Sequence, residues 1–197
     1  MTGVLANQQI TELMDRGIIA ADTPFVEGQV QPASLDLRLG NVAYRVRASF
    51  LAGKGRRVED RLADFEMHRI SLEGGAVLEK GCVYLVPLME RLALPSDISA
   101  VANAKSSTGR LDLLTRTITD EGSEFDRIAA GYQGPLYAEI CPRSFSVLVR
   151  PGMRLNQIRF RHGQSVLSDD ALRALHEEHK PKPFVWSKTA EDILIRE

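Results

Sequence analysis

The sequence predicts an all-β protein, a sandwich or closed barrel of short strands with a short helix near each end. Apolar runs recur at a spacing of roughly 8–12 residues with turn residues between them, which is typical of these two architectures. Leu35, Leu37 and Leu39 alternate with polar residues, the period of two that a strand requires. With 197 residues and a hydrophobic content of 44%, the chain is long enough to enclose a core.

The helices and strands are placed by apolar periodicity and by the residues that start and stop them. Asn7 suits the cap of a first helix that ends at Gly17, and Ser168 suits the cap of a last helix. The basic stretch 52–57 and the acidic stretch 119–127 are expected to be loops. In chain order, the expected elements are a helix at 7–16, strands at 31–40 and 43–50, a hairpin at 77–88 turning at 80–81, strands at 98–102, 111–118, 131–139, 147–149 and 155–160, and a helix at 168–179.

The strand at 31–40 carries a carboxylate and a guanidinium, Asp36 and Arg38, on its polar face. Two residues apart on one face of a half-buried strand, they are close enough to interact. One interpretation is a surface ion pair worth at most about 1 kcal/mol. The other is a contact with a second subunit or a ligand, and the pattern favours neither.

The charge balance excludes some partners. There are 25 Lys and Arg residues against 26 Asp and Glu residues, and no long basic block, so a surface for duplex nucleic acid is not expected. A single nucleotide needs only a local cluster of cations. No apolar run approaches the roughly 18 residues of a membrane span, and the N-terminus lacks the pattern of a signal peptide. With Cys82 and Cys141 as the only cysteines, a cytoplasmic protein with reduced thiols is expected.

Metal and nucleophile motifs are absent from the sequence. His176 and His179 are three residues apart, whereas the zincin motif needs four, so they are assigned to the polar face of a helix. Two scattered cysteines cannot supply the Pro-Cys-x-x-Cys of the zinc deaminases, so no zinc is expected. No P-loop or dinucleotide fingerprint is present, and no histidine lies near Ser106 or Ser107 in the sequence.

The stretch from Lys105 to Arg110 (Lys-Ser-Ser-Thr-Gly-Arg) is the strongest candidate for binding a polyphosphate. It places two hydroxyls, a glycine and two cations within six residues, between two expected strands. Backbone N–H groups freed by Gly109, a guanidinium fork and a compact ammonium are groups that bind phosphate. Alone the signal is weak, because loops with serine, glycine and flanking charges are common connectors.

Glu139 is the candidate for proton transfer. It lies on a largely apolar strand among Leu136, Ala138 and Ile140, where a carboxylate costs several kcal/mol unless it is paired or functional. A positioned acid or base of this kind typically contributes about 10²–10⁴ in rate. On spacing alone, a glutamate on the solvent face of an edge strand is the favoured interpretation.

Four motifs in order resemble those of the dCTP deaminases, which share a fold with the trimeric dUTPases. They are Pro32–Gly40 (Pro-Ala-Ser-Leu-Asp-Leu-Arg-Leu-Gly), Lys105–Arg110, the segment from Gly131-Tyr132-Gln133-Gly134 to Glu139, and the segment from Arg150-Pro151-Gly152-Met153 to Gln157. The resemblance covers about residues 5–162. It is nearest to the N-terminal domain of a longer form of the family in which two related domains are fused.

The resemblance implies a distorted β-barrel or jelly roll, a homotrimer or a multiple of it, and active sites between subunits. Glu139 matches the catalytic glutamate, which takes a proton from the water attacking C4 of cytosine and passes it to N3 without zinc. Ser106 and Arg110 are implied to position that water and the phosphates, and magnesium arrives on the triphosphate. The residues implied to bind the nucleotide are Lys105, Ser106, Ser107, Arg110, Arg116, Tyr132 and Gln157. Lys105 stands where many members have arginine.

Three departures from the family pattern concern the base pocket. Arg116-Thr117-Ile118-Thr119 stands where a His-Val-Thr-Ala-like segment is usual, and an insertion of several residues follows. Ala129 stands at the position of the aspartate that activates water in dUTPases. The tail that closes over the nucleotide in relatives is not recognisable in 184–197. These departures put base recognition in question and leave phosphate binding better supported.

The function expected is therefore hydrolytic deamination of dCTP to dUTP and ammonia, by a barrel domain at 1–165 that a helix and tail at 166–197 follow. Two alternatives stay open. One is a non-catalytic nucleotide-binding or assembly domain of a longer deaminase, and the other is a dUTPase-type pyrophosphatase, for which the aspartate is missing. Asp36 or Arg38 is expected to support a subunit contact.

Overall fold

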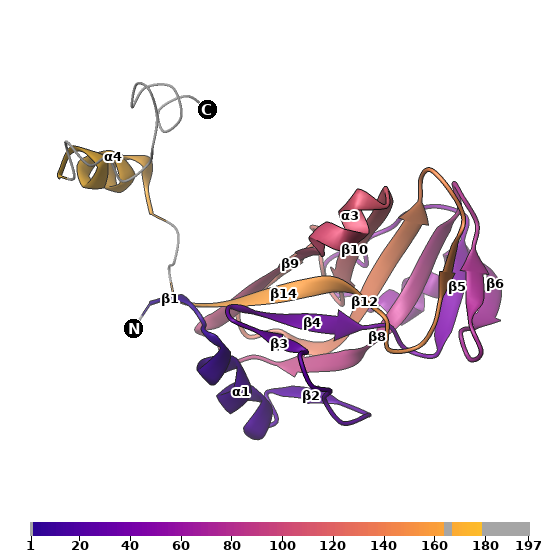
Figure 1. Ribbon diagram of the computed structural model, residues 1–197, viewed down its shortest axis with the longest axis horizontal. Coiled ribbons are helices and arrows are strands. Elements are labelled where there is room, and N and C mark those ends of the chain that lie inside the picture. The colour runs from indigo at the N-terminus through magenta and orange to yellow at the C-terminus, as the bar shows by residue number, and fades with distance from the viewer. Residues whose placement is uncertain (1, 164–166, 179–197) are drawn as a thin grey trace. The chain divides into compact units, whose positions relative to one another are not determined.

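The computed structural model describes residues 2–163 and 167–178, and its chain divides into two compact units, 1–163 and 164–197 (Figure 1). Every strand that the structure describes lies in the first unit. In the second, the helix α4 (Asp169–Glu178) begins after Ser168, whose hydroxyl accepts a hydrogen bond from the Ala171 N–H at 3.2 Å. The tail expected at 184–197 lies outside the described residues. No helix of the described part of the chain is long and apolar enough to cross a membrane.

The first sheet is antiparallel and has the strand order β11-β9-β14-β4-β3, with β1 added beside β14 (Figure 1). Its expected strands at 98–102 and 155–160 are present and slightly longer. The helix α1 (Asn7–Asp15) begins after Ala6, so Asn7 is not the cap that the sequence predicts. The strands are β1 (Gly3–Val4), β3 (Val30–Gln31), β4 (Ser34–Arg38), β9 (Ile98–Ala104), β11 (Arg127–Ile128) and β14 (Arg154–His162).

The second sheet is also antiparallel, with the order β10-β12-β8-β5-β6 and β2 added beside β8. It holds the expected strand that leads into Glu139. The strands are β2 (Ile19–Ala21), β5 (Val42–Val46), β6 (Glu66–Ser71), β8 (Val83–Ala93), β10 (Leu113–Thr119) and β12 (Gln133–Pro142). A small third sheet pairs β7 (Ala76–Leu78) with β13 (Val147–Val149).

The main core lies between the two large sheets, where Leu39 and Leu88 form a bridge that links them. A second apolar cluster lies on the opposite face of the second sheet, around Leu85, Ile118 and Tyr137. The helix α2 (Val58–Phe65) packs Val58 and Leu62 into this cluster. The second sheet is therefore buried on both faces where β8 and β12 run.

Two sequence-based expectations about these elements are wrong. The expected hairpin at 77–88 has its turn, with Gly81 at φ +77°, but β7 pairs with β13 and β8 pairs with other strands. Every residue of β4 is buried, so it is not a half-buried strand. The loop expected at 52–57 is present, but the helix α2 that follows it was not predicted. The two errors concern which segments pair with a strand or cover it, and that is decided by segments far away in the sequence.

Candidate active site

Glu139 is placed on the outer face of the second sheet, not in the main core. Side chains alternate along β12, so Leu136, Ala138 and Ile140 face the main core while Tyr137 and Glu139 face the second apolar cluster. Glu139 is 3% exposed and lies on a central strand, between β10 and β8. The edge-strand interpretation is therefore wrong, and this carboxylate needs a partner to be buried.

Its partner is Arg116, which lies directly opposite Glu139 in the β10–β12 register. Nε and Nη2 of Arg116 both donate to Oε1 of Glu139, the Nε bond at 3.1 Å, and the side chains are 29% and 4% exposed. Oε2 accepts no hydrogen bond from the described residues. Because antiparallel strands place opposite residues within reach of each other, the register alone brings this cation to the carboxylate.

Two loop residues fix the guanidinium from outside. Nη2 of Arg116 also donates to the Ser49 hydroxyl at 3.1 Å, and its Cζ lies 3.7 Å from the centre of the Phe125 ring. This distance is well within the limit of about 6 Å that is usual for a cation–π contact. Phe125 belongs to the acidic loop 119–127, so this loop covers Arg116, which in turn covers Glu139.

The next residue, Asp126, holds that loop against β10. Its Oδ1 accepts the Thr117 N–H at 2.7 Å, and its backbone N–H donates to the Thr117 carbonyl at 2.9 Å. Burial raises the pKa of the Asp126 carboxyl, while its hydrogen bond from the Thr117 backbone and the charge of Arg116 oppose that rise. The backbone of Asp126 has a φ of +62°, which is uncommon for a non-glycine residue.

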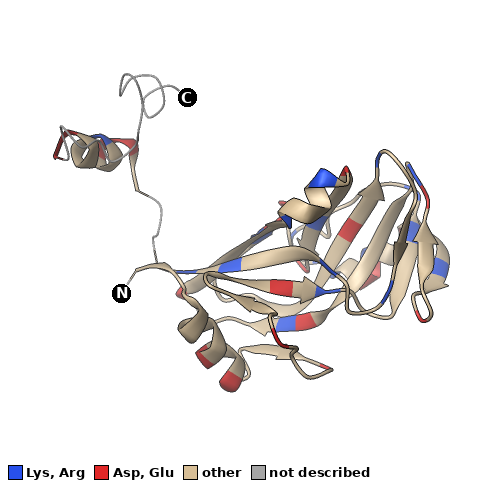
Figure 2. Cartoon of the chain, viewed as in Figure 1, with Lys and Arg blue, Asp and Glu red and all other residues tan. Residues whose placement is uncertain are grey.

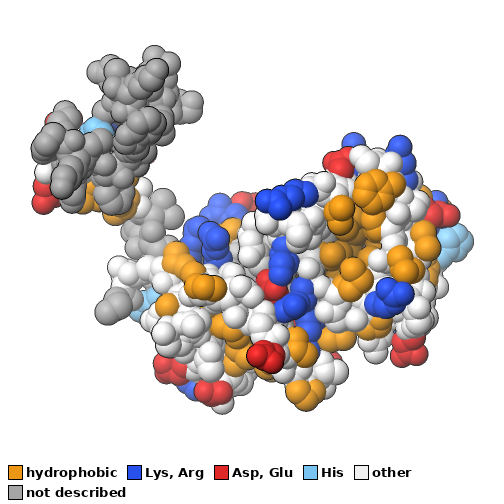
Figure 3. Space-filling model, viewed as in Figure 1, with side chains coloured by type: hydrophobic (Ala, Val, Ile, Leu, Met, Phe, Trp, Pro, Cys, Tyr) orange, Lys and Arg blue, Asp and Glu red, His pale blue; other side chains and the backbone are white. Residues whose placement is uncertain are grey.

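The Lys105–Arg110 stretch is a helix rather than the loop that the sequence suggests. In α3 (Ser106–Arg110) the Gly109 N–H donates to the Lys105 carbonyl at 3.0 Å, and the φ of Gly109 is not positive. Glycine therefore frees no backbone donor here. Ser106, Ser107 and Arg110 are exposed at one end of the first sheet, and blue side chains gather there in Figure 3.

Lys105 caps this helix and pairs with Asp36 of β4, a carboxylate only 1% exposed. Arg154 approaches the same Oδ2 atom at 3.6 Å, and Gln157 lies opposite Asp36 in the register. Oδ1 of Asp36 is buried without a hydrogen-bond partner. The expected pairing of Asp36 with Arg38 does not form, because both faces of β4 are covered and each side chain has a different neighbour.

Arg38 forms a second buried ion pair, with Glu90 of β8. Its Nε donates to Oε1 of Glu90 at 2.7 Å, and its other guanidinium nitrogens donate to the carbonyls of Pro24 and Thr23. Gln29 also donates to Oε1, at 2.7 Å. Arg38 is thus committed within its own chain, which does not support the expected role at a subunit contact.

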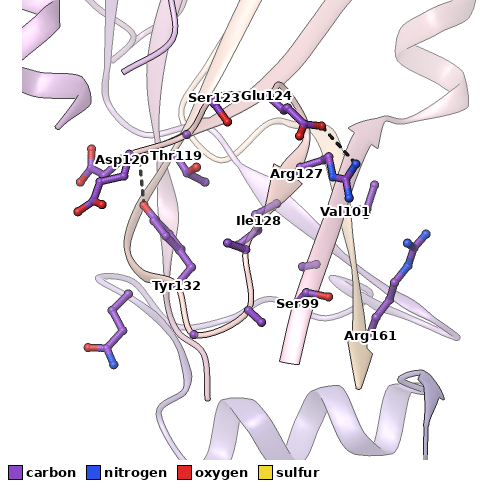
Figure 4. Close-up of a pocket in the computed structure, with 17 residues that line it drawn as sticks. Ser99, Val101, Thr119, Asp120, Ser123, Glu124, Arg127, Ile128, Tyr132 and Arg161 are labelled. Atoms are coloured by element: carbon purple, nitrogen blue, oxygen red, sulfur yellow. Dashed lines mark hydrogen bonds and ion pairs between the residues drawn. The ribbon is translucent and has the colours of Figure 1, made fainter. Parts of the chain in front are cut away.

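A cavity of about 650 Å³ lies beside the acidic loop, in the size range of small-molecule sites (Figure 4). Its wall includes Ser99 and Val101 of β9, Arg161 of β14, and the loop on either side of Ile128. Tyr132 lies at its edge; its hydroxyl donates to the Pro135 carbonyl at 2.5 Å and accepts the Asp120 N–H at 3.2 Å. Burial raises the pKa of Tyr132 far above its usual range, so it acts as a neutral hydrogen-bonding group.

The structure brings only some of the predicted site residues together. Glu139 and Arg116 are in contact, and Lys105 shares Asp36 with Arg154 next to Gln157. Glu139 and Arg116 line neither the cavity at Tyr132 nor a second one of about 400 Å³ at Gly109. No cluster of three His, Cys, Asp or Glu side chains suited to a metal was found in the residues that the structure describes.

Sequence reasoning did not identify Ser49, Phe125 or Asp126, which surround the Glu139 pair. A signal did exist for one of them. Phe125 is an aromatic residue in an otherwise polar and acidic loop, and such a side chain is usually placed against a surface. Ser49 follows β5 in a stretch with no distinguishing pattern, so only the fold reveals it.

The comparison with protein families matches residues 1–164 to the family described as the 2'-deoxycytidine 5'-triphosphate deaminase (DCD) N-terminal domain. Curated relatives include a protein named dCTP deaminase from Haloarcula marismortui, 28% identical over 80% of this chain and 79% of its own length. Another, from Methanoculleus marisnigri, is named dCTP deaminase, dUMP-forming, and is 32% identical over 80% of this chain and 79% of its own length.

A solved structure is also similar, a 2'-deoxycytidine 5'-triphosphate deaminase from Agrobacterium tumefaciens. The TM-score is 0.84 and the identity 57%, over 90% of this chain. The chain spans only 53% of the length of that protein. The resemblance drawn from the four sequence motifs is thus confirmed, and with it the all-β barrel that it implies.

Proposed function

Because this chain belongs to the family of dCTP deaminase N-terminal domains, we propose that it catalyses the hydrolytic deamination of dCTP to dUTP and ammonia. The observation that carries the proposal is Glu139, a carboxylate 3% exposed on a central strand and held by a cation. Proton transfer needs a carboxyl group held in one position, and a buried glutamate on a central strand supplies one.

In the proposed reaction, Glu139 accepts a proton from a water molecule whose oxygen forms a bond to C4 of cytosine. The proton passes to N3, and the resulting tetrahedral carbon then loses its amino group as ammonia, with a further proton from the attacking water. Both bonds from Arg116 go to Oε1, so Oε2 is the oxygen that exchanges protons with the substrate. No metal takes part in this scheme.

The triphosphate is proposed to bind as its magnesium complex at α3, where Ser106, Ser107 and Arg110 are exposed. Arg110 makes no ion pair with a described residue and is available as a guanidinium fork. In one chain α3 does not meet Glu139 in a common cavity. This separation supports the further proposal of a homo-oligomer, trimeric or a multiple, in which α3 of one subunit completes the Glu139 site of another.

A second function is favoured by two observations: the chain spans 53% of the Agrobacterium structure, and Glu139 is covered. In this alternative the chain holds nucleotide or assembles a longer deaminase without turning over by itself. A dUTPase-type pyrophosphatase is disfavoured by Ala129, which supplies no carboxylate at the cavity wall.

The experiment that tests the proposal incubates the purified chain with dCTP and magnesium and follows ammonia and nucleotide products together. Ammonia appearing with dUTP is the expected result. Bound but unchanged dCTP would support the non-catalytic alternative, and pyrophosphate release would identify the dUTPase-type activity. Gel filtration with light scattering on the same sample checks the proposed oligomer.

A further inference from the structure

The carboxylate to which we assign proton transfer is already occupied by its own chain. The Glu139 side chain is 4% exposed, and its contact from the outer side is the Arg116 guanidinium, which lies 3.7 Å from the Phe125 ring. Neither of the two cavities described above is lined by Glu139. A pyrimidine base that occupies the place of the guanidinium beside Oε1 of Glu139 therefore has to displace Arg116.

The guanidinium shares two properties with the base on which deamination acts. Both are flat groups that stack on aromatic rings, and both carry an N–H donor for a carboxylate, which in cytosine is the N4 amino group. Arg116 makes these two contacts at once, donating Nε and Nη2 to Glu139 and stacking on Phe125.

We propose that Arg116 and Phe125 form an internal plug that occupies the cytosine subsite beside Glu139 and that an incoming base displaces. This inference rests on the proposed function, since it assumes that Glu139 faces the base. The N4 amino group of cytosine replaces the guanidinium as a donor to the carboxylate, and the ring of the base replaces it on the face of Phe125.

The position of the plug allows it to open without unfolding the sheet. The Arg116 side chain is 29% exposed, and its other partners, Ser49 and Phe125, both lie in loops. The loop that carries Phe125 is held at its base by Asp126 on Thr117, so Phe125 moves without loss of the β10–β12 ladder. Arg38, at 4% exposure and with its donors on Glu90 and two carbonyls, has no such freedom.

The test measures the accessibility of Glu139 directly, by carbodiimide coupling of an amine and site-resolved mass spectrometry on the full chain. Phe125→Ala removes the aromatic stack and keeps the ion pair, while Arg116→Gln removes the cation. The matched control is Arg91→Gln, on β8 of the same sheet, whose 3.0 Å pair with Asp22 is exposed. Thermal unfolding shows which variants are folded. If Arg116→Gln does not fold, the test is made with Phe125→Ala alone.

We expect Glu139 to be protected in the wild type and in Arg91→Gln and to be labelled in the two plug variants. If the plug is closed for 90–99% of the time, its removal strengthens dCTP binding by about 10–100-fold, as seen by calorimetry. We also expect dCTP to protect Glu139 in Phe125→Ala. Equal labelling of Glu139 in wild type and folded Phe125→Ala overturns the plug.

The outcomes separate this inference from the proposed activity. Labelling of Glu139 in the plug variants but not in the wild type, with no ammonia released by any variant, supports the plug and contradicts the deaminase activity of this chain. Ammonia released by a wild type whose Glu139 is labelled as fast as in Phe125→Ala supports the activity and contradicts the plug.

Discussion

In the part of the chain that the structure describes, two arginine–glutamate pairs contain a buried glutamate, and they differ in what surrounds them. At Arg38 and Glu90 the side chains are 4% and 0% exposed. Backbone carbonyls accept the other guanidinium donors, and Oε2 of Glu90 accepts the Arg38 backbone N–H at 2.8 Å. At Arg116 and Glu139 the arginine is 29% exposed, and Oε2 of the glutamate accepts no bond from a described residue. The sign and number of charges are the same at the two sites.

The difference shows that a buried ion pair does not by itself identify a functional site. A pair whose hydrogen-bonding groups are all satisfied is difficult to open, because each broken bond leaves a buried polar group without a partner. A pair in which the arginine is partly exposed and one carboxylate oxygen accepts no hydrogen bond costs less free energy to open. From this contrast we propose a structural role for Arg38 and Glu90, and a role in the proposed reaction for Arg116 and Glu139. Figure 2 shows red and blue positions spread along the strands.

The largest effect expected is on turnover, in Glu139→Gln. The amide has the same shape but accepts no proton, so ammonia release from dCTP should fall by about 10²–10⁴-fold or more, with nucleotide binding retained. The measurement is an ammonia assay beside a calorimetric titration. Glu79→Gln, at an exposed glutamate, is the control and should match the wild type. Turnover that survives in Glu139→Gln would remove this residue from the mechanism.

A substitution in the Arg38–Glu90 pair should lower the free energy of unfolding rather than the rate of turnover. Glu90→Gln leaves the buried Arg38 charge without a counter-ion, which typically costs about 3–5 kcal/mol, and urea unfolding measures this loss. Asp22→Asn, which breaks the exposed pair with Arg91, should cost less than about 1 kcal/mol. A loss in Glu90→Gln no greater than in Asp22→Asn would mean that the two buried pairs are not distinct in kind.

Ser49→Ala sharpens the comparison at the reactive pair. It removes the 3.1 Å bond from Nη2 of Arg116 and leaves the ion pair with Glu139 in place. We expect the free energy of unfolding to fall by about 0.5–1.5 kcal/mol and the labelling of Glu139 to increase. Unchanged labelling would show that Ser49 does not hold the guanidinium.

The smallest effect concerns Asp126, whose pKa is raised by burial above its ordinary value of 3.8. A raised pKa means that the folded protein binds this proton more tightly than the unfolded chain. Its contribution to stability is therefore fully present below pH 3.8 and is lost as the pH rises through the raised value. Asp126→Asn should raise stability near neutral pH by less than about 1 kcal/mol, because solvent screens a partly exposed group. Urea unfolding across this pH range should show a flatter profile; an unchanged slope would contradict the assignment.

Local sequence information was sufficient for most of the strands. Periods of two and turn residues located the segments at 98–102, 111–118, 147–149 and 155–160, because alternation and chain reversal depend on neighbouring residues. They did not show that β7 pairs with β13, since pairing depends on residues about 70 positions apart. The Lys105–Arg110 helix was also missed, because serine, threonine and glycine are weak helix formers whose single turn is fixed by packing on β10.

The sequence by itself determined the all-β class, the order of the four family motifs and the choice of Glu139 as the carboxylate to examine. The tertiary structure decided which side chains form ion pairs. Glu139 pairs with Arg116 rather than Arg110, Asp36 pairs with Lys105, and Arg38 pairs with Glu90. The physical reason is that a residue type and its spacing fix what chemistry a side chain can perform. The burial of that side chain and its partner are set by the strand register and by the loops that cover the sheet. The register and the loops bring together segments whose contact cannot be read from either segment's own sequence.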